Sequence, residues 1–451
     1  MPQSAAASGE DRRLIDKART VQWNALASWP EAAFEEDLIR RRYLWTTLVV
    51  VNAPEGVRHV LVDNAENYRR SRVARRLFEP SCGPTSLAVS EGETWRRHRR
   101  VMAPAFHARR LPVLAPRVVA AAERMMAGWA VRGAAEPVDI QREMDELAVD
   151  VTSRLVFSLE ADDELAAFGA AIRRYLAEIR PGFGDYLGLP EWLAPGRRRR
   201  ARAIVGPADR LIYRLIEARR GAPPADDLLG LLATQPGSGE AALSDAEIRD
   251  EIVTLFAAGS ETTANALSWV WHLLATHPAE EALLHRELEA VLGERPPRFD
   301  DIPRLKRTRL IVDETLRLYP PIHRIGREAI AADTVLGHRI PKGATVVISP
   351  WVLHRHHRRW AAPERFIPDR FSPDRAAARD RYTYLPFGAG PHVCIGATLA
   401  VTELVLLIAA IAQRYRFESI AGVAVEPVGR MTLRVADGLP MWLRRRAQGQ
   451  R

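Results

Sequence analysis

The segment Phe-Gly-Ala-Gly-Pro-His-Val-Cys-Ile-Gly, at residues 387–396, decides how this chain is organised. Three glycines and a proline surround a single cysteine, Cys394. Glycine allows close backbone approaches that a Cβ atom would block, so the segment predicts a rigid loop lying against another group. An apolar run over about 397–414 follows and predicts a helix that begins just after the cysteine.

The position of Cys394 gives its sulfur a chemical role. Backbone N–H groups and the positive dipole end at a helix start favour a thiolate, which is either a nucleophile or a metal ligand. The chain has two cysteines, so a zinc site built from several thiolates is excluded. One thiolate on the metal of a cofactor fits this frame best, and a buried structural cysteine is the alternative. Cys82 has no such frame and is expected in the core.

A second unusual segment lies inside a long predicted helix. Ser244 and Glu247 form a capping-box pattern, and an apolar helical pattern then runs over about 245–276. Such a helix is about 48 Å long and has little polar surface at its middle, so it must cross the interior. Its centre, 258–263, nevertheless reads Ala-Gly-Ser-Glu-Thr-Thr, which combines weak helix formers with a carboxylate.

Composition excludes several classes of protein. The 451 residues are 47% apolar and 27% charged, as in globular proteins, and the two cysteines exclude a disulfide scaffold. Residues 1–20 are polar and show no secretory signal, and no apolar run reaches the ~20 residues that span a bilayer. The net charge of +9 permits nucleic acid, an anionic membrane surface or an acidic partner, or reflects genome composition alone.

The domain organisation follows from the absence of long linkers and repeats. Residues 1–12 are expected to form a disordered leader, and 13–451 a single domain. Strand patterns are confined to about 40–65 and 325–350, and helical patterns fill most of the rest. The predicted fold is therefore mainly α with a small β subdomain.

Five motifs, in this order along the chain, resemble those of the cytochrome P450 family of heme-thiolate monooxygenases. The segment 387–396 fits the heme-binding signature Phe-x-x-Gly-x-(Arg/His)-x-Cys-x-Gly, and 258–263 fits the oxygen-activation motif (Ala/Gly)-Gly-x-(Asp/Glu)-Thr-(Thr/Ser). Trp-x-x-x-Arg occurs at 95–99, Glu-x-x-Arg at 314–317 and Pro-x-Arg-Phe at 368–371. The resemblance covers residues 40–445 or so and implies the cytochrome P450 fold.

The resemblance implies one heme b (iron protoporphyrin IX) as cofactor. Cys394 is then the axial ligand of the iron, where a thiolate pushes electron density onto the metal and favours O–O cleavage. Phe387 is expected on the sulfur side, and His392 at a heme propionate, where the family more often has arginine. The residues of these two motifs that the resemblance places at the heme are Phe387, Gly388, His392, Gly396 and Ala258.

The central helix is expected to handle protons. Thr262 and Thr263 can bond back to the carbonyl groups of Ala258 and Gly259, which loosens the helix locally. The resemblance implies that O₂ lies in this opening, that Thr262 forms a hydrogen bond to the oxygen, and that Glu261 relays protons. The alternative is a buried glutamate paired with an arginine.

The remaining motifs imply cofactor contacts and scaffold. Trp95 and Arg99 are expected to donate to the heme propionates. Arg327 is a further propionate partner, with Arg324 as its competitor and Arg70 as a weaker choice. His98 is expected at the surface. Glu314 and Arg317, joined by Arg370, are expected to form a structural network under the heme.

The implied activity is that of an oxidoreductase acting on paired donors with O₂. One oxygen atom enters an apolar organic substrate, and electrons come from a separate ferredoxin and ferredoxin reductase, or from a flavodoxin-type donor. The chain is expected to be a cytoplasmic monomer with no membrane anchor and no nucleic-acid partner.

Two other functions stay open at this point. One is a heme-thiolate peroxygenase or isomerase that does not use O₂, and the other is a basic helical protein that binds nucleic acid. The substrate is equally open among terpenoids, fatty acids, steroids and aromatic ethers. The resemblance implies a pocket that draws on the segments 71–90, 180–196, 255–259, 322–325 and 429–432, with apolar members such as Phe78, Phe183 and Met431.

Overall fold

The computed structural model describes residues 24–43, 46–132, 136–159, 162–179, 196–220, 227–234 and 242–446. The predicted leader 1–12 and Phe183 lie outside these ranges. In the described residues, the helices are α2 (Pro54–Arg58), α3 (Arg72–Cys82), α4 (Gly92–Met102), α5 (Leu111–Arg132), α6 (Ile140–Phe157), α7 (Asp163–Glu178), α9 (Gly196–Arg220), α10 (Leu228–Thr234), α11 (Asp245–Thr276), α12 (Pro278–Leu292), α13 (Lys306–Leu318), α14 (Pro350–Leu353), α15 (Pro373–Ala377) and α16 (Ala397–Arg414).

The strands are short and form separate small sheets. They are β1 (Leu38–Tyr43), β2 (Thr46–Val51), β3 (Tyr68–Arg70), β4 (Val138–Asp139), β5 (Ile325–Ala329), β6 (Asp333–Val335), β7 (His338–Ile340), β8 (Thr345–Ile348), β9 (Tyr415–Ser419), β10 (Pro427–Gly429), β11 (Leu433–Val435) and β12 (Pro440–Arg445). The predicted class, mainly α with a small β portion, is confirmed.

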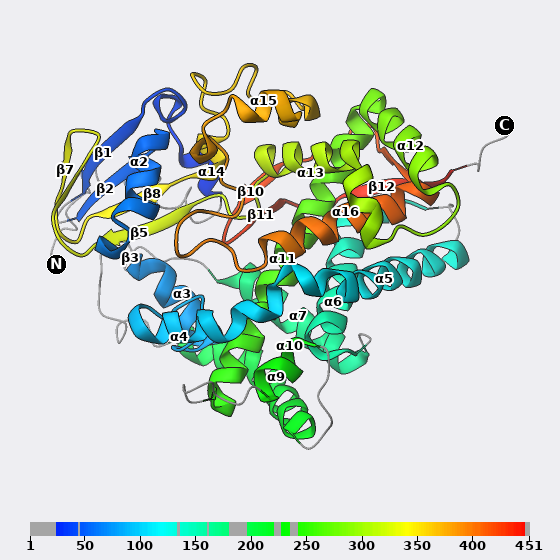
Figure 1. Ribbon diagram of the computed structural model, residues 1–451, viewed down its shortest axis with the longest axis horizontal. Helices are drawn as coiled ribbons and strands as arrows, with labels where there is room; N and C mark the ends of the chain where they lie inside the picture. Colours follow the sequence, from blue (N-terminus) through cyan, green and yellow to red (C-terminus); the bar gives the residue numbers. More distant parts are fainter. Residues whose placement is uncertain are drawn as a thin grey trace, which may run out of the picture.

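The largest sheet has five strands in the order β1-β2-β8-β5-β3. β2 pairs with β8 in parallel, through Val49 opposite Val346, and the other neighbours are antiparallel. Because these strands are rich in valine and isoleucine, their buried faces form one cluster with Leu61 and Leu353. Figure 1 shows this sheet at one side of the molecule and most of the helices at the other.

The β-rich segment predicted over about 40–65 is strand only as far as Val51. Pro54 starts α2, and a π-type turn, η3, continues it over His59–Asp63. Proline suits a first helical turn because its missing N–H has no partner there in any case. The predicted segment also begins two residues after the start of β1, since the three consecutive arginines, 40–42, hide the buried Ile39 that pairs with Val50.

Helix α11 has the bounds that the capping pattern predicted. Ser244 accepts from the N–H of Glu247, and the Glu247 carboxylate accepts from the N–H of Ser244. The helix is unbroken through Gly259, and it packs against α6, α16 and α9. It therefore runs between the two large hydrophobic clusters, one with α5, α6 and α16 and the other with α3, α7 and α9.

Helix α16 is the only helix in the described ranges whose length and hydropathy match those of a membrane-spanning segment. Most of its residues are buried inside the protein, where Val405, Leu407 and Ile411 belong to the largest hydrophobic cluster. Its apolar character is thus that of a core helix. The loop 387–396 enters it directly from the side of the sheet.

Candidate active site

The loop before α16 can be built only with glycine at two positions. Gly388 and Gly390 both have φ of +73°, a region that side chains rarely adopt. A Cβ atom on Gly390 would lie 1.7 Å from the carbonyl oxygen of Leu61 in η3. The N–H of Cys394 then donates to the carbonyl of Phe387 at 2.9 Å, which closes the loop. The predicted rigid loop therefore holds the cysteine at a fixed place.

The Cys394 thiol is exposed on one side and surrounded by protein on the others. Burial raises the pKa of this thiol, while the N–H of Gly396 and the Arg99 guanidinium act in the opposite direction. A coordinated metal ion deprotonates such a thiol outright, so the sulfur is suited to metal ligation more than to free nucleophilic attack. Cys82, by contrast, is buried in the core beside Ser81, as predicted.

The centre of α11 is open at one point. Ala258 is exposed and Thr262 half-buried, although Phe256, Ser260 and Glu261 around them are buried. The Thr262 hydroxyl donates to the carbonyl of Ala258 at 2.6 Å, as predicted. An exposed alanine halfway along a core helix is the feature expected where a ligand approaches the backbone closely.

Thr263 behaves differently from the prediction, because its hydroxyl donates to Glu403 of α16 at 3.5 Å instead of to Gly259. This contact joins the centre of α11 to the helix that follows Cys394. Ile395, beside the cysteine, packs against the same hydrophobic cluster as Phe256 of α11. The two unusual segments of the sequence therefore meet in one part of the core.

Glu261 is buried and bonded to a hydroxyl group. Thr432, between β10 and β11, donates to its Oε1 at 2.6 Å, and no arginine of the described residues forms an ion pair with it. Burial raises the pKa of Glu261, while Thr432 and the more distant Arg434 and Arg173 lower it. The alternative of a glutamate directly paired with an arginine is therefore not what the structure has.

Cationic side chains gather around His392. Arg70 donates to Nδ1 of His392 at 3.1 Å, and the ring of Trp95 lies 4.1 Å from the imidazole ring, centroid to centroid. Burial, together with Arg70, Arg327 and Arg99, lowers the pKa of His392 to about 3, so this histidine is neutral. The structure thus brings together four of the predicted contacts and also Arg70.

This cationic cluster, defined as Arg70, Arg99 and Arg327, has an excess of positive charge. Glu91 is the carboxylate that contacts it in the described part of the chain, 3.8 Å from Nε of Arg70. Arg327 is buried, and its side-chain hydrogen bond goes to the carbonyl of its neighbour Gly326. Burial and Arg70 lower the pKa of Arg327 to about 10. The three guanidinium groups carry three positive charges and Glu91 carries one negative charge. The cluster can therefore bind a group with two further negative charges.

Two predictions about neighbouring residues are resolved by these contacts. Arg324 lies beside His323 and acts on its charge, whereas Arg327 acts on His392, so Arg327 and not Arg324 joins the cluster. The prediction that His98 is exposed is wrong, because its ring is fully buried and Nδ1 lies 2.7 Å from Glu251 Oε1. Its position on the inward face of α4, against α11, explains the difference.

The Glu-x-x-Arg motif forms a buried network, as predicted. Both nitrogens of an Arg317 fork donate to the carboxylate of Glu314, at 2.7 and 2.8 Å. Arg370 donates to the same carboxylate at 3.2 Å, and the N–H of Ile367 at 2.8 Å. Arg317 also donates to the carbonyl groups of His354 and Pro363. The network ties α13 to the segment that leads toward the cysteine loop.

These residues fit a heme. A flat group with two carboxylates matches the two spare positive charges of the cationic cluster, and the glycine loop presents one sulfur beside it. The exposed Ala258 and Thr262 lie on the helix that packs against α16. Cys394 would hold the iron, and Arg70, Arg99, Arg327 and Trp95 the propionates.

Sequence comparison agrees with this geometry. The family model described as Cytochrome P450 matches residues 32–436. The chain therefore belongs to the cytochrome P450 family, and it is a heme-thiolate monooxygenase.

Several characterised relatives are bacterial. Cyclooctatin synthase of Streptomyces melanosporofaciens is 37% identical over 387 residues, which cover 84% of this chain and 83% of that protein. Cyclooctat-9-en-7-ol 5-monooxygenase of the same organism is 37% identical, with 82% and 80% covered. Pentalenene oxygenase of Streptomyces avermitilis is 31% identical, with 92% and 91% covered.

A solved structure shares the fold. The crystal structure of the cytochrome P450DA heme domain superposes with a TM-score of 0.80 at 25% identity, and the match covers 98% of this chain and 94% of that one.

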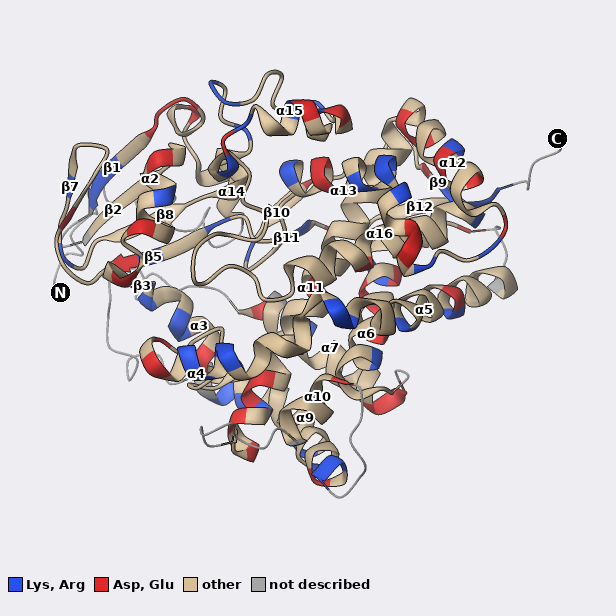
Figure 2. Cartoon of the chain, in the orientation of Figure 1, with Lys and Arg blue, Asp and Glu red and all other residues tan. Residues whose placement is uncertain are grey.

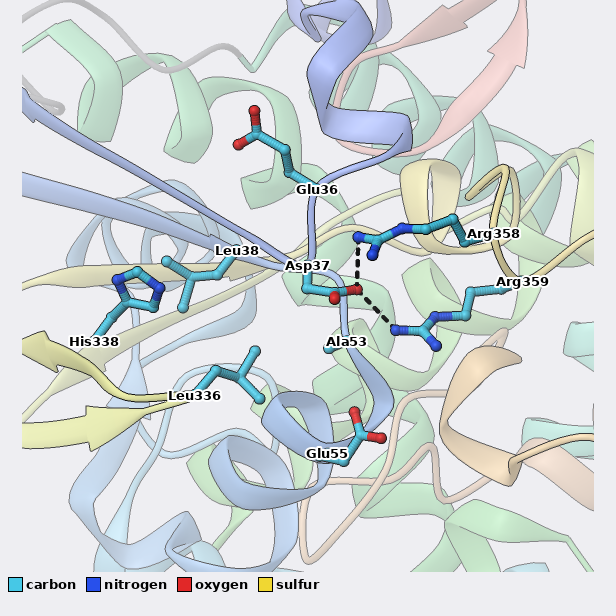
Figure 3. A pocket seen from close by; sticks show the side chains of 9 residues that line it. All are labelled: Glu36, Asp37, Leu38, Ala53, Glu55, Leu336, His338, Arg358 and Arg359. Atoms are coloured by element: carbon cyan, nitrogen blue, oxygen red, sulfur yellow. Dashed lines mark hydrogen bonds and ion pairs between the residues drawn. The ribbon is translucent and has the colours of Figure 1, made fainter.

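Two surface recesses lie away from these residues. One, of about 490 Å³, is lined by residues that include Asp37, Leu336 and His338. Figure 3 shows its Asp37 carboxylate held by Arg358 and Arg359, at 3.2 and 2.7 Å. The other, of about 810 Å³, lies between α7 and α9. Neither contains a predicted site residue.

Sequence reasoning missed Glu91, placed Thr432 only in a pocket segment, and undervalued Arg70. Thr432 and Glu91 stand in no recognisable motif, and their partners are far away in sequence. Arg70 was the weaker choice as a propionate partner, but the structure places it in the cationic cluster beside His392.

Proposed function

We propose that this protein inserts one oxygen atom of O₂ into a terpene alkene or terpene alcohol, with electrons from a ferredoxin and its reductase. The other oxygen atom leaves as water, which takes up two electrons and two protons. The observation that carries the proposal is the meeting of the Cys394 loop, the cationic cluster and the open centre of α11.

The cofactor in this proposal is heme b, whose iron activates O₂ when it is bound. Cys394 holds the iron as a thiolate, and the N–H of Gly396 tempers the charge on the sulfur. Phe387 packs against the main hydrophobic cluster and keeps water from the sulfur side. Gly388 and Gly390 let the loop pack closely against its neighbours. On the opposite face of the heme, the small side chain of Ala258 leaves space.

Proton delivery falls to Glu261 and Thr262. The Thr262 hydroxyl donates to Ala258 and can turn toward bound O₂, since it is the half-buried hydroxyl at the open point of α11. Burial raises the pKa of the Glu261 carboxyl group, one residue earlier, which suits a group that takes up and passes on protons. This pair favours O₂ chemistry over the peroxygenase or isomerase alternative.

The substrate class rests on the named relatives and on apolar side chains around the site. Pentalenene and cyclooctat-9-en-7-ol are, by their names, an alkene and an unsaturated alcohol. Ile322, which is 40% exposed before β5, and the half-buried Leu255 and Met431 offer an apolar surface to such molecules. Fatty acids, by contrast, need a cation for the carboxylate, which Arg324 or Arg430 would have to supply.

The electron donor and cellular setting extend the same proposal. The net charge of +9 suits an acidic ferredoxin, and basic side chains on α4 lie close to the cysteine, as Arg99 shows. Figure 2 shows basic and acidic residues mixed on most helices, unlike the single basic face expected for binding nucleic acid. We propose a cytoplasmic monomer with a separate redox partner.

Turnover with labelled oxygen tests this function. The holoenzyme is incubated with pentalenene and related terpenes in ¹⁸O₂, with NADPH, ferredoxin and ferredoxin reductase. We expect a hydroxylated product that contains one ¹⁸O atom per oxidation. A parallel reaction with hydrogen peroxide and no reductant is the control. Product from peroxide alone would favour the peroxygenase alternative, and product from a fatty acid alone would contradict the substrate class.

A further inference from the structure

Glu261 stands at the end of a series of hydrogen bonds that crosses from α6 to α11 and to the turn between β10 and β11. Nε2 of Gln141 lies 3.3 Å from both Asp145 Oδ1 and Asn265 Oδ1. Nδ2 of Asn265 donates to the Thr432 hydroxyl at 3.2 Å, and that hydroxyl donates to Oε1 of Glu261 at 2.6 Å. Three side chains, those of Gln141, Asn265 and Thr432, thus connect the half-buried Asp145 to the buried glutamate.

The Asp145 carboxylate fixes which atom donates and which accepts in every hydrogen bond of this series. A carboxylate only accepts, so the amide nitrogen of Gln141, and not its oxygen, faces Asp145. The second N–H of that amide meets the oxygen of Asn265, which leaves the Asn265 nitrogen facing Thr432. Because the Thr432 oxygen accepts from Asn265, its single proton points to Glu261.

The consequence is a difference between the two oxygens of Glu261. Oε1 is occupied as an acceptor, so a proton on the carboxyl group must sit on Oε2. Oε2 is buried and has no hydrogen-bond partner among the residues that the structure describes. We infer that Thr432 is a positioning residue, which fixes Glu261 so that Oε2 carries and exchanges the catalytic proton. This inference rests on the proton-delivery role proposed above for Glu261.

Charged groups from three elements face Glu261. Arg434 on β11 and Arg173 on α7 lower the pKa of Glu261, Asp145 on α6 raises it, and burial raises it most. The Thr432 hydrogen bond stabilises the ionised form and so also lowers this pKa. Removal of the hydroxyl alone therefore raises the pKa further, while the charges around it stay the same.

Infrared titration of the resting holoenzyme tests the inference without any turnover. The Glu261 carboxyl band is identified by its loss in Glu261→Gln and followed against pH in the wild type, Thr432→Val and Thr432→Ser. We expect the pKa of Glu261 to rise by about one to two pH units in Thr432→Val, since a hydrogen bond to a charged group is lost. Thr432→Ser, which keeps the hydroxyl, should titrate like the wild type.

An unchanged pKa in Thr432→Val would overturn the inference. If that variant does not fold, Asn265→Leu serves instead, because it frees the Thr432 proton to point elsewhere and should move the same pKa upward by less. The product formed per NADPH should fall in Thr432→Val and recover in Thr432→Ser, and full coupling in Thr432→Val would also contradict the inference. If no terpene is oxidised, the pKa of Glu261 can still be measured by infrared titration. The proposed function and this inference can therefore be rejected independently.

Discussion

At the scale of single residues, the neighbours Thr262 and Glu261 face different partners, and we propose that they divide the handling of protons. Thr262 is half-buried, and its hydroxyl donates to Ala258 on the open side of α11. Glu261 points to Thr432, from the turn before β11. In the proposed mechanism Thr262 therefore lies on the side of the open point, and Glu261 supplies the proton from the buried side.

Thr262→Ala should uncouple NADPH consumption from product formation. The variant keeps the α11 backbone and the cationic cluster, so heme content should be unchanged. Without the hydroxyl, proton delivery is misdirected, and we expect product per NADPH to fall by roughly tenfold or more, with hydrogen peroxide released instead. Thr262→Ser is the matched control. Wild-type coupling in Thr262→Ala would mean that protons do not pass through Thr262.

The motif residues could be predicted from the sequence because each motif is local. Gly388, Cys394, Ala258 and Thr262 stand where their spacing placed them. Thr432 falls in the predicted pocket segment 429–432, but its bond to Glu261 could not be predicted, since the two lie 171 residues apart and only the fold brings them together. His98 was misplaced for the same reason, because its partner Glu251 lies on another helix.

At the scale of elements, α11 and β1 show which features a sequence specifies well and which it does not. A capping box and an apolar pattern define α11 with little dependence on the rest of the chain. β1 depends on its neighbour β2, because only pairing with that strand buries Ile39 among three arginines. Local signals thus predict the helices, whereas the pairing of strands in the sheet is seen only in the structure.

Arg317→Ala tests the buried network on α13. Removal of Arg317 leaves the fully buried Glu314 carboxylate without its two main donors. Breaking a buried pair in this way costs about 3–5 kcal/mol of unfolding free energy. Arg142→Ala, in the exposed Arg142–Glu146 pair, is the control and should lower the unfolding free energy far less, because exposed ion pairs contribute little to stability. Urea unfolding followed by circular dichroism measures both, and equal losses would contradict a scaffold role.

At the scale of the whole molecule, the two core helices α11 and α16 are joined by a titratable group. Glu403 on α16 is buried, and it accepts a hydrogen bond from Thr263 on α11. Burial raises the pKa of Glu403 from its ordinary value of 4.5 to about 8. The folded protein therefore holds a proton there that the unfolded chain releases above about pH 4.5.

The stability of the molecule should thus depend on pH through Glu403. Between pH 4.5 and 8 the folded state binds the extra proton, so this group lowers the unfolding free energy as pH rises, by at most ~1.4 kcal/mol per pH unit. Glu403→Gln removes the dependence. The difference in unfolding free energy between variant and wild type should grow from pH 5 to pH 8, and a constant difference would refute the raised pKa.

The most direct test of the central claim is the carbon monoxide difference spectrum of the dithionite-reduced holoenzyme, measured beside Cys394→Ser. Thiolate ligation by Cys394 predicts the long-wavelength Soret band typical of heme-thiolate proteins in the wild type and its loss in the variant. A heme band without that displacement in the wild type, or the displaced band in Cys394→Ser, would contradict Cys394 as the iron ligand.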